Sequence, residues 1–464
     1  MKRILSKITR SGGRHKRDLF SSKLGVIAAA AGSAVGLGNI WRFPNEAGKY
    51  GGAAFVIVYL LIILTTGLPV MLSELIIGRK TRRNVYGAFA KLATKKPWTV
   101  AGYMGIGAAF MILAFYGVVA GWSFEYIIHA ISGSFVEKSP ADFEKLFAGF
   151  ISSPFKPIFW QLLFMALTAF IVFSGIKNGI EKASKIMMPM LFFLIIILAV
   201  RAITLPGAMK GLRFLFHPDF SKLTPNAILS AMGQAFFSLS LGMGVLITYG
   251  SYIDDKNNLP HTALSVVIAD VLIAILAGIA IFPAVFAFNI QPDQAGPGLV
   301  FITLPNVFQF MPAGSFFAVL FFVLLILAAL TSSISILEVV VSYFVEEIKI
   351  NRHIATVLAT ALISMLGMLC SLSFGKSELS IKMFGMSFFE LFDFISSKIL
   401  LPVGGLLIAL FMGWYVGKDT IKKELSNHNA IHLPLFPVFL FLIRFVSPLA
   451  IVLIFLRELG FITL

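Results

Sequence analysis

Residues 24–52 combine an apolar helix-forming run with glycines and polar residues that a simple membrane anchor would not contain. The stretch LGVIAAAAGSAVGLGNIWRFPNEAGKYGG begins as a membrane helix and then carries Asn39, Arg42 and Pro44 among several glycines. Inside a bilayer every backbone N–H and C=O needs a partner, so irregular backbone is tolerated only where it faces protein or a wet cavity. An interrupted helix exposes carbonyl oxygens that suit a cation and N–H groups that suit a carboxylate. The segment therefore predicts a ligand site at membrane depth.

A second apolar segment is interrupted in the same way, at residues 233–244, GQAFFSLSLGMG. The two interruptions lie five apolar segments apart, and corresponding breaks in two five-helix halves are typical of transporters built from inverted repeats. The alternative is that the small residues serve close helix packing, as in Gly32-x-x-x-Gly36. Packing alone does not account for the polar residues beside the glycines, which are Asn39, Arg42, Gln234 and Ser240.

The composition excludes a soluble domain and predicts an all-α integral membrane protein. Of 464 residues, 58% are hydrophobic and 13% are charged, and the single cysteine, Cys370, excludes an intrachain disulfide and a thiolate metal cluster. Apolar segments of spanning length fall at 24–49, 54–78, 99–131, 156–175, 184–206, 226–253, 262–288, 314–345, 353–373, 387–416 and 434–457. We therefore expect eleven spans. Residues 299–312, broken by Pro305 and Pro312, are too short to span and predict a re-entrant external hairpin.

The positive charges predict the orientation of these spans. The net charge of +16 is concentrated in segments such as residues 1–23 and the loop after the second span, whereas residues 289–313 have no Lys or Arg. Cytoplasmic loops carry such an excess of Lys and Arg, so nucleic-acid binding is not needed to explain it. Residues 1–23 lack the apolar core and cleavage site of a signal peptide and predict a cytoplasmic basic tail. An odd number of spans then places the carboxyl terminus outside.

The motifs AGSAVGLGNIWRFP, GGAAFVIVYLL, GQAFFSLSLGMG and LTSSIS, with the acidic Glu390 and Asp393, closely resemble neurotransmitter:sodium symporters from Arg17 onward. The resemblance implies a LeuT-type 5+5 inverted repeat with broken helices 1 and 6, in which Na⁺ gradients drive amino-acid-like substrates into the cell across its inner or plasma membrane. The repeats would be residues 24–206 and 226–416, and residues 434–457 would add one C-terminal helix. The eleven-span count is similar to the shorter bacterial branch.

The resemblance implies two Na⁺ sites made of oxygen ligands, which a hard cation prefers. The first would combine the substrate carboxylate, which couples ion and substrate binding, with the Ala34 carbonyl and the side chains of Asn39, Ser238 and Asp270. The second would use the carbonyls of Gly32, Val35 and Ala328 and the hydroxyls of Thr331 and Ser332. For the two hydroxyls, hydrogen bonding to their own helix is the alternative.

Asp270 lies in the apolar segment 262–288 with no cationic neighbour in that segment. A carboxylate in a membrane helix indicates a functional site by default. A fixed negative charge here resembles the chloride-independent members of the family, and the resemblance places Tyr59, Gln234 and Ser238 around it. We therefore expect Na⁺ to be required and chloride not to be. The alternative is a protonated Asp270 in a helix interface.

The resemblance places the substrate pocket between spans 1, 3, 6 and 8. The substrate amino group would meet the carbonyls of Ala34 and Phe237 and the Ser240 hydroxyl. Its carboxylate would meet the backbone N–H groups of Leu37 and Gly38, the first Na⁺ and Tyr116, whose alternative role is an interfacial anchor. The side-chain subsite would be formed by Ile112, Phe237, Met243, Ser332 and Ile336.

The pocket residues favour a hydrophobic L-amino acid over an amine. Carriers of monoamines need a carboxylate in the interrupted first helix, and neither Ser33 nor Gly36 is acidic. Met243 between two glycines provides a soft side chain on flexible backbone. The triplet resembles bacterial members that accept bulky aromatic substrates, so we expect tryptophan, tyrosine, phenylalanine and leucine.

Two gates are also implied by the resemblance. Outside, Arg42 would face Asp393, with Phe237 and Tyr116 as an aromatic lid. Inside, Arg17 would pair with Glu346 near Phe20 and Tyr252, although family members often have Trp and Asp at the Phe20 and Glu346 positions. Solvated charge at a membrane edge is the alternative for Arg17 and Glu346.

Three other functions compete with a Na⁺-coupled symporter. A proton-coupled carrier of the same fold is disfavoured by Thr331 and Ser332, since a Lys or Arg at the second ion site would indicate protons. A channel would have weak sites and flux that does not saturate. An enzyme is disfavoured because H-E-x-x-H, G-x-S-x-G and P-loop patterns are absent. The expected partners are a small L-amino acid and the bilayer. The sequence assigns no function to Arg444, which lies inside the last span and whose side chain can snorkel to an interface.

Overall fold

The computed structural model describes residues 18–93, 96–288, 297–374 and 382–461. Within these ranges the chain is helical, with one isolated β-bridge between Met383 and Met386. Among the described residues, nine helical stretches are long and apolar enough to cross a membrane, and a tenth span results if the bent first pair is counted as one. The predicted sixth span is divided into helices of 14 and 6 residues, neither of which reaches spanning length alone. The count of eleven therefore stays a prediction.

The first span is broken where the sequence predicts it. Helix α2 (Lys23–Ala34) is capped at its amino end by Ser22, whose hydroxyl accepts from the Gly25 N–H at 3.0 Å. It ends because Val35 adopts extended backbone, with φ −75° and ψ 101°. The chain continues as a π-helical turn, η1 (Gly38–Arg42), and α3 (Phe43–Lys49), at 51° to α2. The unwound residues 35 and 36 are buried in the middle of the bundle.

The sixth span is broken by residues in left-handed conformation. Helix α12 (Pro225–Ser238) stops before Ser240, Gly242 and Gly244, whose φ angles are 55°, 80° and 76°, and α13 (Val245–Gly250) follows. Positive φ ends an α-helix, and glycine adopts it without the steric cost that other residues meet. The sequence GMG therefore contributes directly to the break.

The remaining spans are α4–η2–α5 (Ala53–Ile62, Ile63–Gly67, Leu68–Thr81), α7 (Thr99–Ile131), α9 (Lys156–Phe173), η4–α10 (Ile176–Glu181, Lys182–Ile203), α14 (Leu259–Ala287), α16 (Gly314–Glu346), α17 (Arg352–Leu372), α18–η7–α19–η8 (Phe388–Asp393, Phe394–Leu400, Leu401–Leu410, Phe411–Tyr415) and α21–η9–α22 (Phe436–Phe441, Leu442–Val446, Ser447–Glu458). The short helices are α6 (Val85–Leu92), η3 (Lys96–Trp98), α8 (Pro140–Ile151), α11 (Ala208–Phe216), η5 (Phe220–Lys222), η6–α15 (Leu299–Thr303, Leu304–Phe310) and α20 (Lys418–Leu425). The apolar pair η6–α15 is too short to span, which agrees with the predicted length of that segment.

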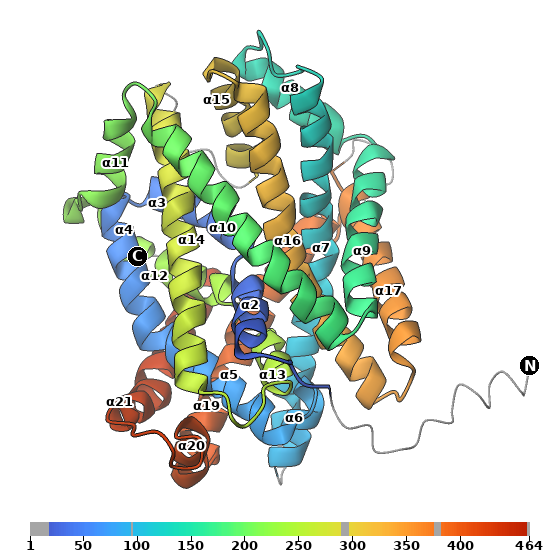
Figure 1. Cartoon of the computed structure of the whole chain (residues 1–464), viewed down its shortest axis with the longest axis vertical. Helices are drawn as coiled ribbons and strands as arrows, with labels where there is room; N and C mark the ends of the chain where they lie inside the picture. Colours follow the sequence, from blue (N-terminus) through green and yellow to red (C-terminus); the bar gives the residue numbers. More distant parts are fainter. Residues whose placement is uncertain (1–17, 94–95, 289–296, 375–381, 462–464) are drawn as a thin grey trace, which may run out of the picture.

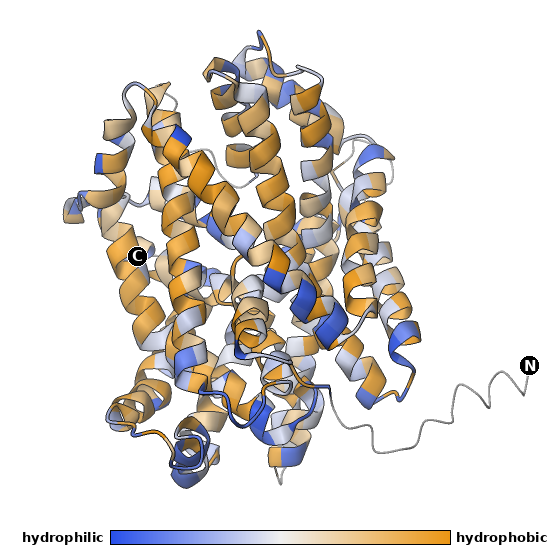
Figure 2. Ribbon diagram, viewed as in Figure 1, coloured by the Kyte–Doolittle hydropathy of each residue, from blue (hydrophilic) through white to orange (hydrophobic). Residues whose placement is uncertain are grey.

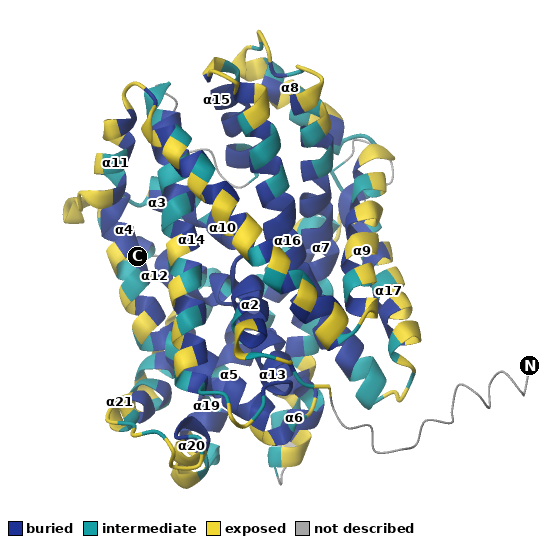
Figure 3. Cartoon of the chain, in the orientation of Figure 1, coloured by how far each residue is buried: buried dark blue, intermediate teal, exposed yellow. Residues whose placement is uncertain are grey.

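Helices α7 and α16 run side by side through the middle of the molecule, and α9 and α17 cover their outer side (Figure 1). In their most apolar windows, α16 and α7 are 78% and 72% buried, whereas α9 is 33% buried. Figure 3 shows the exposed positions along α9, α10 and α17, and Figure 2 shows that the outward faces are largely apolar. An apolar outer face around a buried polar centre fits a protein whose solvent is lipid. The broken first and sixth spans lie in that centre.

Candidate ion and substrate site

Three side chains from different spans meet beside the break in the first span. The Nδ2 atom of Asn39 donates to a carboxylate oxygen of Asp270 at 2.7 Å and to Ser238 Oγ at 3.1 Å. Ser238 Oγ donates to the same Asp270 oxygen at 2.7 Å, and Tyr59 Oη donates to the other at 3.1 Å. All four residues are buried. The structure thus brings together the three side chains predicted for the first Na⁺ site.

In the described part of the chain, the donors that bond to the Asp270 side chain are all neutral groups. No Lys, Arg or His lies within 4.0 Å of its carboxylate among the described ion pairs. A buried carboxylate without a cationic partner is costly, and a metal cation is one of the groups that compensates it. Gln234, expected near Asp270, instead donates to the Gly38 carbonyl at 3.0 Å.

The second predicted oxygen cluster lies on the other side of the unwound residues. The Thr331 hydroxyl is 2.9 Å from the Ala328 carbonyl and 3.3 Å from the Val35 carbonyl. The Ser332 hydroxyl is 3.4 Å from the Gly32 carbonyl and 3.3 Å from that of Val35. Because α2 ends at Ala34, the Val35 carbonyl is free of the helix ladder and turns toward α16. The five predicted groups of the second Na⁺ site are therefore neighbours, and Thr331 also bonds to its own helix as the alternative expects.

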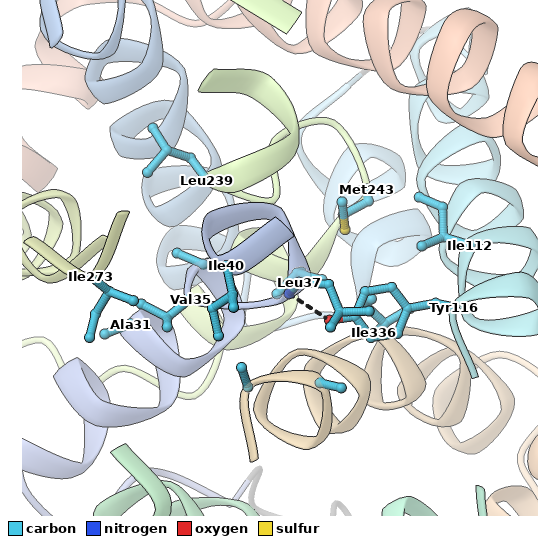
Figure 4. Packing of buried hydrophobic residues seen from close by; sticks show 14 of the residues in the cluster. Ala31, Val35, Leu37, Ile40, Ile112, Tyr116, Leu239, Met243, Ile273 and Ile336 are labelled. Carbon is cyan, nitrogen blue, oxygen red and sulfur yellow. Dashed lines mark hydrogen bonds between the residues drawn. The ribbon is translucent and has the colours of Figure 1, made fainter. Parts of the chain in front are cut away.

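A small cavity lies between the two oxygen clusters. Its volume is about 20 Å³, and all ten predicted substrate-binding residues line it: Ala34, Leu37, Gly38, Ile112, Tyr116, Phe237, Ser240, Met243, Ser332 and Ile336. The Leu37 N–H donates to the Tyr116 hydroxyl at 3.2 Å, and Figure 4 shows Ile112, Met243 and Ile336 gathered around this pair. Space of this size holds about one water molecule, so an amino acid needs side chains such as Met243 to move.

A larger vestibule of about 410 Å³ begins where the small cavity ends, and Leu37, Gly38, Tyr116 and Phe237 line both spaces. The Arg42 guanidinium lies over the Phe237 ring, 4.9 Å from its centroid. Asp393 lines the same vestibule and accepts from Ser397 Oγ at 2.8 Å. Among the described ion pairs, none joins Arg42 to Asp393 within 4.0 Å. The two predicted outer-gate charges thus share one space without contacting each other.

The predicted inner gate is described only in part, because Arg17 lies outside the described residues. Glu346 accepts from the backbone N–H and the Nδ2 of Asn84 at 3.0 Å and 3.1 Å. The Phe20 ring meets the rings of Tyr249 and Tyr252 edge-on, at 5.7 Å and 6.1 Å between centroids. Phe20 is therefore packed beside Tyr252, as expected, at the start of α2.

Several charged residues in the spans were not singled out in the sequence analysis, and two of them, Glu74 and Glu338, are buried. Glu74 accepts from the Gly242 N–H at 2.8 Å, directly at the break in the sixth span. Glu338 binds Arg352 at 2.5 Å and accepts from the Tyr252 hydroxyl at 2.6 Å. Both glutamates lie in apolar spans, which is itself a signal of function. Lys398 and Glu458, 3.5 Å apart, line the vestibule from two other spans.

Comparison with known proteins places this arrangement in one family. The model of the sodium:neurotransmitter symporter family matches residues 17–139 and 151–462. Uncharacterized sodium-dependent transporters of Bacillus subtilis and Haemophilus influenzae are each 41% identical over 444 and 456 residues, with 96% of this chain and 98% of each relative covered. A crystal structure of MhsT in complex with L-phenylalanine has a TM-score of 0.86 and 46% identity, with coverage of 95% of this chain and 100% of that one.

The match extends over both broken spans, both oxygen clusters and the cavity between them, so the expected fold and transport class are confirmed. The chain belongs to the sodium:neurotransmitter symporter family and is a multi-pass membrane transporter of the LeuT-type fold, not an enzyme.

Proposed function

We propose that the chain is a symporter that uses two Na⁺ ions to carry hydrophobic and aromatic L-amino acids into the cell, without a requirement for chloride. The observation that carries this proposal is the position of the small cavity. Ala34 and Ser238, which are predicted ligands of the first Na⁺, and Ser332, a predicted ligand of the second, all line it. A substrate in this cavity would contact both ion sites, which is what obligatory coupling of substrate and ions requires.

An α-amino acid fits the polar groups of the cavity. Its carboxylate would accept from the Leu37 and Gly38 N–H groups and the Tyr116 hydroxyl, and would complete the first Na⁺ site. Its ammonium would donate to the carbonyls of Ala34 and Phe237, with Ser240 beside them. In the described structure no Asp or Glu lines the cavity, so an amine without a carboxylate would have no counter-charge there.

The remaining walls favour an apolar or aromatic side chain. Ile112, Met243 and Ile336 are buried hydrophobic residues, and the Phe237 ring closes the side toward the vestibule. Aromatic and aliphatic side chains gain free energy from burial against such walls. The similar MhsT has been crystallised with L-phenylalanine, which supports an aromatic substrate for this chain.

Asp270 supports chloride independence. Its two carboxyl oxygens accept from Asn39, Ser238 and Tyr59, which favours a fixed negative charge in the polar centre beside the proposed first ion site. A second anion would be repelled there. In this proposal Asp270 stays ionised while Na⁺ is bound, the amino terminus is cytoplasmic, and alternating closure of the Arg42–Asp393 and Arg17–Glu346 pairs gates the two sides.

Uptake of radiolabelled L-tryptophan and L-leucine into proteoliposomes tests the proposal, with external Na⁺, K⁺, chloride and pH varied one at a time. Saturable uptake that needs Na⁺ and persists when gluconate replaces chloride would support it. Loss of uptake without chloride would contradict the role given to Asp270. Uptake driven equally by a pH gradient without Na⁺ would replace the Na⁺ mechanism with a proton-coupled one.

A further inference from the structure

Arg444 is a cationic residue inside a membrane span and outside the transport pathway. It lies in the π-helical turn η9, nine residues into the span Phe436–Glu458, and it lines neither the cavity nor the vestibule. At 1.5 Å per residue, its backbone is about 12 Å from the first residue of that span. A long side chain at this depth reaches the interface by snorkelling. Its position alone therefore places the charge close to the lipid headgroups.

The guanidinium of Arg444 is held in a fixed place by the neighbouring span. Its Nε donates to the Gly413 carbonyl at 2.7 Å, and its Cζ lies 5.6 Å from the centroid of the Trp414 indole ring. Gly413 permits this approach, because a Cβ there would be 3.1 Å from Arg444 Cγ and 3.2 Å from Arg444 Cα. The indole N–H of Trp414 donates back to the Arg444 carbonyl at 3.3 Å. The two spans thus lock the side chain.

Two donor nitrogens of this locked guanidinium remain available. Within the described part of the chain, no acceptor bonds to Nη1 or Nη2 of Arg444, and no carboxylate lies within 4.0 Å. A guanidinium held inside a membrane span without a counter-ion is costly. The pair of terminal N–H groups matches the spacing of two phosphate oxygens and binds them bidentately. The two free N–H groups of Arg444 would therefore be satisfied by the oxygen atoms of a phosphate group.

The surroundings of Arg444 are lipid-facing. Trp414, Phe441 and Phe445 have exposed fractions of 60%, 57% and 52%, and the Phe445 ring lies 5.5 Å from Trp414 and 5.7 Å from Phe441 between centroids. Aromatic residues at membrane interfaces pack against lipid chains while a polar end meets the headgroups. The exposed rings would contact acyl chains of the same lipid whose phosphate meets Arg444.

The adjoining loop favours a negatively charged headgroup. Helix α20 begins four residues after Trp414 and carries exposed Lys418, Lys422 and Lys423 against one exposed acid, Asp419. Its other acid, Glu424, is turned inward to Arg79, at 3.1 Å. Figures 1 and 2 show the hydrophilic α20 beside the apolar α21 at one end of the bundle. Lysines beside a membrane attract anionic lipids.

We propose that Arg444 and Trp414 form a binding site for the phosphodiester group of an anionic phospholipid, in the leaflet next to α20. A second copy of the chain is the competing occupant. A two-fold contact centred on this face would bring two Arg444 guanidinium groups toward each other with no counter-charge between them, which is unfavourable. A lipid phosphate neutralises the charge instead. The lipid would link the spans that end at Tyr415 and begin at Phe436.

Native mass spectrometry of the delipidated full-length protein, titrated with phosphatidylglycerol or phosphatidylcholine, tests the site. The variant Arg444→Leu is expected to bind phosphatidylglycerol about tenfold more weakly than wild type, the loss of one charge-assisted contact. The matched control is Arg201→Leu. Arg201 is also half-buried near a span end, lies 5.5 Å from the Phe317 ring centroid, and donates to Thr204 Oγ1 at 3.1 Å. Trp414→Leu, which keeps the charge, is expected to bind severalfold more weakly than wild type.

Each result decides the proposal. Selective weakening of phosphatidylglycerol binding by Arg444→Leu, with Arg201→Leu unchanged, supports it. Equal weakening by both variants shows general charge attraction and overturns it, as does wild-type binding that does not distinguish the two lipids. A changed monomer–dimer equilibrium with unchanged lipid binding assigns the face to a second copy. If Arg444→Leu cannot be purified, Arg444→Lys is used, because it keeps the charge and loses the bidentate fork; unchanged binding by it overturns the proposal.

Discussion

The Nδ2 atom of Asn39 lies 2.7 Å from a carboxylate oxygen of Asp270, a residue 231 positions later in the chain. The other end of the same amide, Oδ1, accepts from the Gly36 N–H at 3.0 Å, inside the unwound part of the first span. One side chain thus connects the break to the buried carboxylate. A Na⁺ ion needs oxygen atoms directed at it, so its entry would compete with the Nδ2 hydrogen bonds. In the proposed mechanism, ion binding in the first site would thereby be linked to the conformation of the break.

Removal of the charge on Asp270 should weaken Na⁺ binding strongly. We expect Asp270→Asn to raise the Na⁺ concentration for half-maximal uptake by about tenfold or more, because a buried unit charge near a cation is worth several kcal/mol. Na⁺ titration of uptake in proteoliposomes measures this. Asp219→Asn, in an exposed turn outside the spans, is the matched control and should behave like wild type. An unchanged Na⁺ requirement in Asp270→Asn would remove this residue from the ion site.

The two neighbouring positions Thr331 and Ser333 should respond differently. Thr331→Val removes a hydroxyl that lies 3.3 Å from the Val35 carbonyl, so we expect a lower affinity for Na⁺ and a reduced Hill coefficient for Na⁺ in uptake. Ser333→Ala removes a buried hydroxyl that has no hydrogen-bond partner in the described structure, and should leave both quantities close to wild type. Similar effects of the two variants would argue that α16 packing, not an ion ligand, is being measured.

A methyl group at Gly36 should close the substrate cavity. A Cβ there would meet Ser332 Oγ and would be 3.0 Å from Tyr116 Oη, both of which border the cavity. We expect Gly36→Ala to reduce uptake at least about tenfold while the protein still reaches the membrane, since real Cβ atoms do not tolerate such contacts. Gly107→Ala is the control, because its Cβ meets only Leu400 Cδ1, at 3.7 Å. Wild-type uptake by Gly36→Ala would place the substrate elsewhere.

The vestibule should be accessible from one side of the membrane only. The native Cys370 is buried, so wild type should not react with a membrane-impermeant thiol reagent. We expect Asn45→Cys, in the vestibule lining, to be labelled from outside and protected by substrate. Lys423→Cys on α20 should be labelled only from the opposite side. Labelling of Asn45→Cys from inside and of Lys423→Cys from outside would contradict the predicted orientation, in which the amino terminus is cytoplasmic, and labelling of both from the same side would contradict their placement on opposite sides.

The full ligand sets of the proposed ion and substrate sites came from the resemblance to the family, but two of their members stand out in the sequence by themselves. Asn39 and Asp270 are polar residues in otherwise apolar spans, and such exceptions are visible in the sequence alone. Glu74 has the same signal, yet its partner is the backbone N–H of Gly242. Every residue except proline has a backbone N–H, so the sequence does not indicate which one a buried carboxylate will bind. The contact between Glu74 and the break in the sixth span could therefore not be inferred.

The ion pairs between residues far apart in the chain could not be predicted from the sequence. Arg79 and Glu424 are 345 positions apart and meet at 3.1 Å, and Lys398 meets Glu458 from another span. Many Lys and Arg residues could satisfy each acid, so composition does not select the pair. The predicted and observed numbers of spans differ for another reason. The predicted sixth span is divided at its break, and its second part, α13, has only six residues, too few to count as a span on its own.

The dispersal of the first ion site along the chain has a consequence for biosynthesis. Asn39 enters the membrane long before Asp270 is translated, and Ser332, which borders the shared cavity, follows later still. During synthesis, polar groups of the early spans such as the Asn39 side chain therefore lack their final hydrogen-bond partners until the later spans are inserted. The proposed second ion site can be completed only once α16, which carries Thr331 and Ser332, has been inserted. A truncated chain ending before that helix would lack any stabilisation that Na⁺ binding at the second site supplies to the finished protein.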